Sequence, residues 1–171
     1  MIIELPLSVA TLAVRGDSGS EHLRAALNRA TAPDHVSLAG ITVLVVDDEA
    51  DAREMISHIL ADNAANVLIA GSADEAQSLL NTQQPDVILS DIGMPNQDGY
   101  EFLTNLRRTG IAIPAAAITA FARSEDHIKA LRAGFQMHLS KPIEPAELLA
   151  AVASLVHGVR ENNLGKAPLK K

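Results

Sequence analysis

Acidic, hydroxyl and amine side chains recur in this sequence at the ends of short apolar segments. The residues in question are Asp47, Asp48, Glu49, Asp91, Thr119 and Lys141. A carboxylate can act as a nucleophile toward a phosphoryl group, and hydroxyl and ammonium groups can stabilise phosphoryl oxygens. A single acid in such a place is commonly only a turn residue. Complementary groups after several segments instead predict phosphoryl chemistry, provided that the fold brings these groups close together.

The segments that precede these residues have the pattern of strands that alternate with helices. We expect strands at residues 41–46, 66–70, 86–90, 114–119 and 136–139. Helical periods fit residues 50–61, a stretch that begins at Ser72, residues 100–108, residues 124–134 and a last helix from Pro145 to about Gly158. Apolar strands separated by helices favour a parallel sheet covered on both faces, and right-handed crossovers make it doubly wound. Ligands of such α/β folds bind at the carboxyl ends of the strands, so these side chains should converge there.

Composition narrows the classes of function. Hydrophobic residues make up 47% of the chain and aromatic residues only 2%, which suits helices packed on a sheet. The net charge of −7 argues against direct binding of nucleic acid, which usually requires a basic patch. The absence of cysteine excludes disulfides and thiolate catalysis. No signal peptide or long apolar span is recognisable, so we expect a cytoplasmic location without membrane contact.

Four motifs in this order resemble the receiver domain of two-component response regulators, the CheY-like domains. They are VLVVDDE at residues 43–49, ILSDIGMPNQDGYEFL at 88–103, AAITAFA at 116–122 and GFQMHLSKPIEPAEL at 134–148. The resemblance extends from residue 41 to about residue 158. It implies a flavodoxin-like (βα)5 fold of three layers, with a parallel sheet in the order 2-1-3-4-5.

The resemblance also implies a role for each group at the sheet edge. Asp91 corresponds to the residue that accepts a phosphoryl group from a phosphohistidine and forms an acyl phosphate. Thr119 and Lys141 correspond to the hydroxyl and the ammonium group that contact the phosphoryl oxygens. A receiver domain catalyses its own phosphotransfer and dephosphorylation in this way, and whether the whole chain counts as an enzyme stays open.

A divalent cation is the cofactor that the resemblance implies. Asp47, Asp48 and Asp91 would hold Mg²⁺ or Mn²⁺ together with the backbone carbonyl of Gly93. Carboxylates placed so close together are not ionised without cost, and a hard dication with a preference for oxygen ligands is a suitable counter-charge.

Further positions match residues that shape or switch the site in the family. Pro95 and Gly99 would shape the loop after Asp91, and the Lys141-Pro142 bond resembles a cis peptide that directs the lysine inward. His138 departs from the family, which usually has Tyr or Phe at this switch position and couples it to the residue that matches Thr119. Imidazole is smaller and titrates near neutral pH, so we hypothesise a different or weaker readout through His138.

The flanks suggest a setting for the receiver domain, which we assign to residues 41–158. Residues 1–40 are predicted to be an extension and linker, and Ile2–Leu7 resembles the last strand of a histidine-kinase ATP-binding domain. Residues 159–171 are predicted to be a polar tail. We therefore expect the C-terminal receiver of a hybrid sensor histidine kinase, with a histidine kinase or a histidine phosphotransfer protein as partner. A stand-alone response regulator, an interaction-only module that is never phosphorylated, and a homodimer stay open as alternatives.

Overall fold

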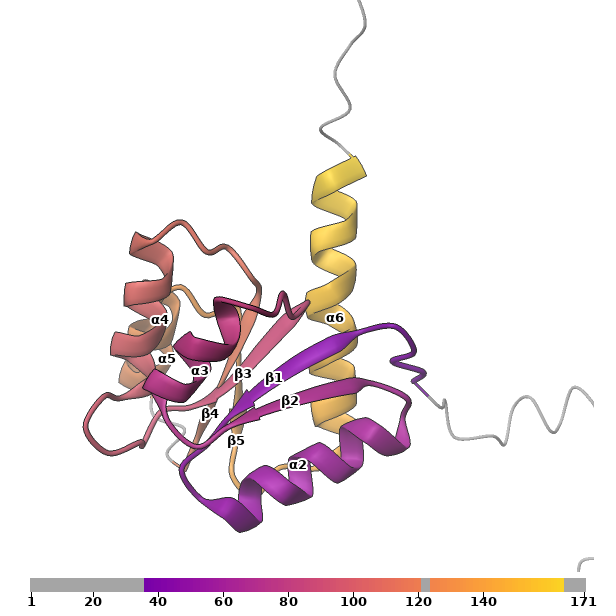
Figure 1. The fold of residues 1–171 in the computed structure, drawn as a ribbon, viewed down its shortest axis with the longest axis horizontal. Helices are drawn as coiled ribbons and strands as arrows, with labels where there is room; N and C mark the ends of the chain where they lie inside the picture. Colours follow the sequence, from indigo (N-terminus) through magenta and orange to yellow (C-terminus); the bar gives the residue numbers. More distant parts are fainter. Residues whose placement is uncertain (1–35, 121–123, 165–171) are drawn as a thin grey trace, which may run out of the picture. The chain divides into compact units, whose positions relative to one another are not determined.

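The computed structural model describes residues 36–120 and 124–164, in which strands and helices alternate (Figure 1). The elements are β1 (Thr42–Val46), α2 (Ala50–Asp62), β2 (Asn66–Ala70), α3 (Ala73–Leu80), β3 (Val87–Asp91), α4 (Gly99–Arg108), β4 (Ala115–Thr119), α5 (Ser124–Ala133), β5 (Met137–Ser140) and α6 (Pro145–Leu164). Each predicted strand is present, with bounds that differ by no more than one residue from the predicted ones.

The strands form one parallel sheet in the order β2-β1-β3-β4-β5. Val43 of β1 lies opposite Val67 of β2 on one side and Val87 of β3 on the other. This order confirms the predicted doubly wound, flavodoxin-like fold. It makes β1 and β3 neighbours inside the sheet, so the acids at their carboxyl ends lie side by side.

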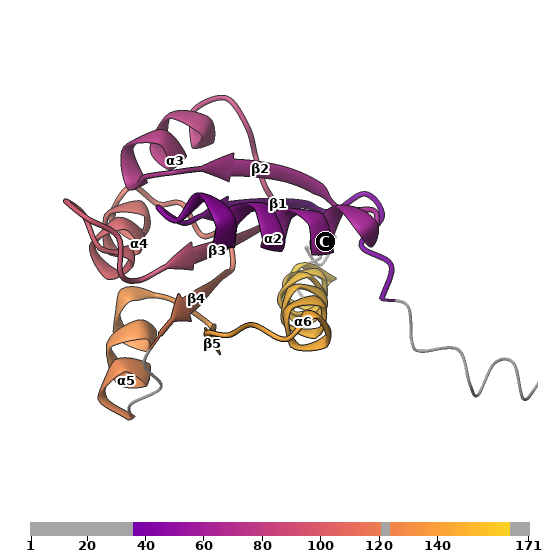
Figure 2. The ribbon, with the colours of Figure 1, turned by 90° about the horizontal axis from the view of Figure 1, so that it is seen from below.

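Helices cover both faces of the sheet, as Figures 1 and 2 show. Val43 and Val45 of β1 pack in one apolar cluster with α2 and α6. Leu44 and Val46 point the other way, into a second cluster with α3, α4 and α5. Successive strand side chains alternate between faces, so a run of apolar residues is what a strand buried on both faces requires.

The guanidinium group of Arg107 joins the carboxyl ends of α4 and α5. Its Nη1 donates a hydrogen bond to the carbonyl of Ile111 at 2.7 Å, and its Nη2 donates to the carbonyls of Ile113 and Gly134 at 2.8 and 3.0 Å. Gly134 has a φ of +102°, and a Cβ there would lie 2.9 Å from the Arg107 side chain. Glycine is therefore required at this turn for both its backbone conformation and its size.

The last helix ends later than predicted, and the buried core begins before the first predicted strand. The last helix was predicted to end near Gly158, which is wrong, because α6 continues to Leu164 and includes residues assigned to the polar tail. An exposed helical glycine costs only about 1 kcal/mol relative to alanine, which is too little to end a helix whose preceding turns are packed. The described core also begins before residue 41, since Leu38 is fully buried and its N–H donates to the Asn63 carbonyl at 2.8 Å.

Some predictions fall on parts of the chain that are not described. The segment Ile2–Leu7, on which the comparison with a kinase ATP-binding domain depends, lies outside the described residues. Within residues 36–120 and 124–164, no helix combines the length and apolar character needed to cross a membrane.

Candidate functional site

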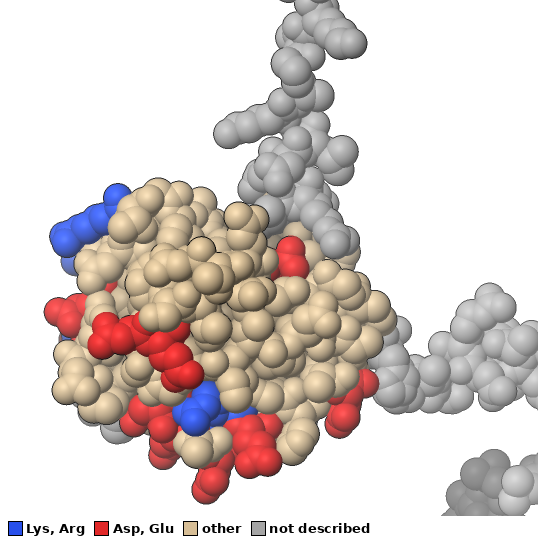
Figure 3. Space-filling view, in the orientation of Figure 1, with Lys and Arg blue, Asp and Glu red and all other residues tan. Residues whose placement is uncertain are grey.

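The predicted site residues meet at the carboxyl edge of the sheet. Asp47 directly follows β1, Asp91 and Thr119 are the last residues of β3 and β4, and Lys141 follows β5. Asp47, Asp91 and Thr119 are the buried members of this group, with exposed fractions of 0%, 5% and 8%. Acidic side chains gather on the part of the surface toward which the strand arrows of Figure 1 point, as the same view in Figure 3 shows.

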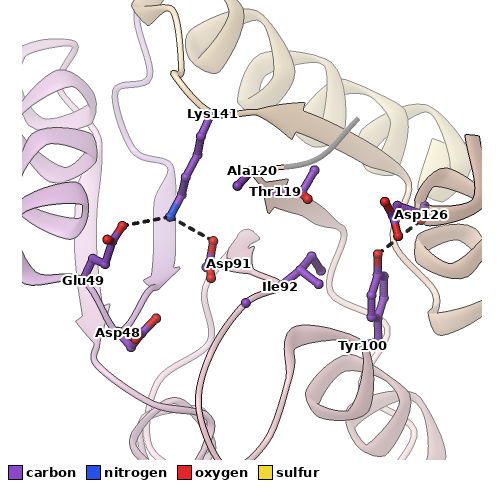
Figure 4. A pocket seen from close by; sticks show the side chains of 10 residues that line it. Asp48, Glu49, Asp91, Ile92, Tyr100, Thr119, Ala120, Asp126 and Lys141 are labelled. Atoms are coloured by element: carbon purple, nitrogen blue, oxygen red, sulfur yellow. Dashed lines mark hydrogen bonds and ion pairs between the residues drawn. The ribbon is translucent and has the colours of Figure 1, made fainter. Parts of the chain in front are cut away.

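The ammonium group of Lys141 connects the carboxylates at this edge. Its Nζ lies 2.9 Å from Oδ1 of Asp91 and 3.0 Å from Oδ2 of Asp47, and Oε2 of Glu49 is 3.4 Å away. Figure 4 shows the lysine side chain extending between Glu49 and Asp91. One cation is thus shared among acids from two adjacent central strands.

Burial and pairing act in opposite directions on the protonation of this group of side chains. Burial disfavours the charged form of Lys141, but hydrogen bonds from its ammonium group to Asp91 and Asp47 outweigh burial and raise its pKa. Burial also raises the pKa of Asp47, against hydrogen bonds from Lys141 and the backbone N–H of Glu49. The lysine is therefore held firmly as a cation, whereas the ionisation of Asp47 is only partly compensated.

Asp47→Asn is expected to change how stability depends on pH. A carboxyl whose pKa is higher in the folded state binds its proton more tightly there, so its ionisation destabilises the fold as the pH rises above its usual pKa of 3.8. The free energy of unfolding of the variant, minus that of the wild type, should therefore increase between about pH 4 and pH 7. Urea unfolding in the presence of a chelator measures this difference, and a difference that is constant with pH would contradict the prediction.

Three carboxylates are close enough to share a metal ion. Asp47, Asp48 and Asp91 each offer an oxygen atom, and these atoms all lie within 4.8 Å of one another. Asp48 is exposed and lines the cleft with Asp91, so an ion could reach the cluster from solvent. A donor set made of carboxylate oxygens fits a hard divalent cation such as Mg²⁺ or Mn²⁺.

The loop after Asp91 folds back on the end of β3. The N–H of Gly99 donates to the carbonyl of Ile92 at 3.1 Å, which closes the loop that contains Pro95. A Cβ at Gly99 would collide with the carbonyl oxygen of Asp91 and lie 3.1 Å from Cα of Ile92. The bond between Lys141 and Pro142 is cis, as the resemblance implied.

Gly99→Ala is expected to destabilise the fold by about 1–3 kcal/mol, because the new methyl group meets backbone atoms that cannot rotate away. Gly158→Ala is the matched control. A Cβ at Gly158 has no neighbour within 4 Å, and the residue lies inside α6, so this variant should be more stable by about 0.5–1 kcal/mol. Thermal unfolding of both variants measures the contrast, and equal shifts would show that the close approach at Gly99 is relaxed without cost.

The site residues border a cleft of about 340 Å³, whose lining also includes residues that the sequence did not single out. Tyr100 and Asp126 line it, and the Tyr100 hydroxyl donates to the backbone carbonyl of Asp126 at 3.3 Å (Figure 4). Burial, together with the charges of Asp126 and Asp98, raises the pKa of Tyr100. Tyr100 could have been selected from the sequence as a site residue, because it follows Gly99 and is the single tyrosine of the chain. Asp126 could not, because its position depends on how α5 packs.

His138 lies apart from the acids. It is on β5 opposite Ala117 of β4, and the described residues that line the cleft do not include it. Its Nδ1 is instead 3.4 Å from Nδ1 of His127 on α5. Its role as a switch together with Thr119 stays a prediction.

Comparison with known proteins agrees with the motifs. The family described as "Response regulator receiver domain" matches residues 43–153. A 14.6 kDa protein of Leptolyngbya boryana is 43% identical over 118 residues, which cover 68% of this chain and 90% of that protein. The phosphate regulon transcriptional regulatory protein PhoB of Escherichia coli is 34% identical over 119 residues, 68% of this chain, and the match spans about half (52%) of its length.

Solved structures share both the fold and a substantial part of the sequence. The receiver domain of the Francisella response regulator 1452 has a TM-score of 0.67 and 32% identity over 70% of this chain and 99% of that chain. The chemotaxis response regulator CheY4 of Vibrio cholerae has a TM-score of 0.64 and 31% identity over 67% of this chain and 98% of its own. With the sheet order and the clustered acids, these matches show that the chain belongs to the response regulator receiver domain family of two-component systems.

Proposed function

We propose that this domain accepts a phosphoryl group on Asp91 and passes the signal on through the state of that residue. The observation that carries the proposal is the position of Lys141, whose ammonium group lies 2.9 Å from Asp91 at the cleft. Receiver domains act with histidine kinases or histidine phosphotransfer proteins, so the donor would be a phosphohistidine.

The proposed transfer uses groups that line the cleft. A carboxylate oxygen of Asp91 attacks the phosphorus, and the bond from phosphorus to the donor imidazole breaks. The imidazole leaves with the electron pair of that bond and takes up a proton, while Asp91 becomes an acyl phosphate. Lys141 would then contact the new phosphoryl oxygens, and the Thr119 hydroxyl would donate a hydrogen bond to one of them.

The acidic cluster supports a metal requirement for this reaction. Asp47, Asp48, Asp91 and the backbone carbonyl of Gly93 would hold Mg²⁺ or Mn²⁺. When bound, such an ion would neutralise part of the charge on the phosphoryl oxygens. Asp47 and Asp48 would also keep the approach to Asp91 acidic until the ion binds, which would disfavour phosphate anions in its absence.

Tyr100 offers a direct test of the proposed function. The chain has one tyrosine and no tryptophan, so its intrinsic fluorescence reports on a residue that lines the cleft. We expect Mg²⁺ followed by beryllofluoride to change this fluorescence, and acetyl phosphate with Mg²⁺ to add one phosphoryl group to the intact mass. Unchanged fluorescence and mass would favour the interaction-only alternative.

We further infer the setting that the sequence predicts, in which this domain is the receiver of a hybrid histidine kinase. The support is the similarity of Ile2–Leu7 to the end of a kinase ATP-binding domain. Two observations distinguish this setting from a stand-alone regulator. One is whether phosphoryl transfer to this domain is faster from a histidine phosphotransfer protein or from a kinase. The other is the reading frame upstream of this sequence in the gene. A cytoplasmic location, an absence of direct contact with nucleic acid and a homodimer stay predictions.

A further inference from the structure

Two histidines from different elements meet where α5 packs against β5. His127 is exposed on α5 and His138 is half-buried on β5. Their Nδ1 atoms are 3.4 Å apart, the ring centroids are 5.3 Å apart and the ring planes cross at 62°. The rings therefore do not stack, and one nitrogen of each faces the other.

The separation of the two nitrogens matches the span of two ligands of one metal ion. Zinc binds imidazole nitrogen at roughly 2.0–2.1 Å, and two such bonds at the tetrahedral angle place the nitrogens about 3.3–3.4 Å apart. The observed distance of 3.4 Å lies in this range. A small rotation of the rings that turns both lone pairs toward a common point would leave the backbone of α5 and β5 where it is.

We propose that His127 and His138 form a binding site for Zn²⁺ or a similar first-row transition metal ion, coordinated through both Nδ1 atoms. Water would fill the remaining positions, which the exposure of His127 permits. Without metal, an Nδ1–H of either ring can donate to the Nδ1 of the other. Metal binding moves that proton to Nε2 of the same ring, so both Nδ1 atoms offer a lone pair.

Ligand chemistry separates this site from the acidic cluster. Imidazole nitrogen favours zinc, nickel and copper, whereas carboxylate oxygen favours magnesium and manganese. Neither histidine is among the described residues that line the cleft at Asp91. The two sites can therefore be filled by different ions, and the proposal does not depend on phosphorylation of Asp91.

Such an ion would tie α5 to the sheet. His138 pairs with Ala117 of β4, two residues before Thr119, and His127 lies in the first half of α5. A bound ion adds a cross-link between helix and strand that exists only in the folded state, so it should raise the thermal stability of the domain.

Calorimetric titration of the whole chain with Zn²⁺ tests the proposal, in excess Mg²⁺ to occupy the acidic cluster. We expect one Zn²⁺ per chain, and a much weaker response to Ca²⁺. Loss of an outer-shell partner already weakens metal binding about 10–100-fold, so His127→Gln and His138→Gln should each weaken it at least as much. His58→Gln, which replaces another exposed histidine on α2, is the matched control and should bind as the wild type does.

Nitrogen NMR of the imidazoles gives a second readout that needs no variant. Zn²⁺ should shift the Nδ1 resonances of His127 and His138, and leave Nε2 of both rings protonated. If Zn²⁺ does not bind, or binds equally to His127→Gln and His138→Gln, the two histidines form only an imidazole–imidazole hydrogen bond and the proposal is overturned.

Discussion

The Asp91→Asn variant is expected to incorporate no phosphoryl group under conditions that label the wild type. An amide has no ionised oxygen with which to form an acyl phosphate, and Asp91 is the acid at the end of β3 that Lys141 contacts most closely. Removal of a nucleophile costs several orders of magnitude in rate, so we expect a loss of at least about 1,000-fold. Intact mass after incubation with a phosphodonor and Mg²⁺ measures the effect.

The control for this variant should remove an acid without touching the cleft. Asp62 is exposed at the end of α2, so Asp62→Asn makes the same chemical change outside the lining of the cleft. It should be labelled at the rate of the wild type. If Asp91→Asn were labelled as well, with Asp62→Asn unchanged, the phosphoryl group would be on another residue and the assignment of Asp91 would be wrong.

Lys141→Met is expected both to prevent stable phosphorylation and to weaken the fold. Its ammonium group is the partner of Asp47 and Asp91, which are buried, and a buried charge that loses its partner is costly. We expect a loss of roughly 1–3 kcal/mol in the free energy of unfolding, measured in urea with a chelator present. Mg²⁺ should restore part of this loss, because it would supply another counter-charge to the same carboxylates.

Two further variants are controls for Lys141→Met: one keeps the positive charge at residue 141, and the other removes a lysine elsewhere. Lys141→Arg keeps the positive charge and should retain most of the stability, although a planar guanidinium group reaches the carboxylates differently. Lys129→Met removes an exposed lysine of α5 and should change little. If Lys141→Met and Lys129→Met were equally stable, the three contacts of Lys141 would contribute nothing to the fold.

The residues of the site could be identified from the sequence because a general rule places them. Each follows an apolar run, and a parallel sheet collects such positions at one edge. The strand order, by contrast, came from the resemblance to a known family, since apolar runs alone do not say which strands are neighbours. The same gap explains why the contacts of Lys141 with Asp47 and Asp91 were not predicted, since the resemblance implied only a contact of its ammonium group with phosphoryl oxygens.

The features that were missed depend on packing between elements. Asp126 lines the cleft, and His127 meets His138, because of the way α5 lies on the sheet, which local pattern does not encode. Leu38 precedes the first strand by a few residues and has no periodic neighbour to mark it as core. Gly158 is typical of a helix end, but packing of the preceding turns of α6 outweighs that local preference.

The two ends of α5 are contacted by different side chains of α4. At the carboxyl end of α5, the guanidinium group of Arg107 donates hydrogen bonds of 2.7–3.0 Å to the carbonyls of Gly134, Ile111 and Ile113. Near its amino end, the Tyr100 hydroxyl reaches the carbonyl of Asp126 at 3.3 Å. The carboxyl end of α5 is therefore held away from the cleft by Arg107, whereas a residue of its first turn contacts a side chain that lines the cleft. A change at the cleft would therefore reach α5 first through Asp126 and Tyr100, rather than through Gly134.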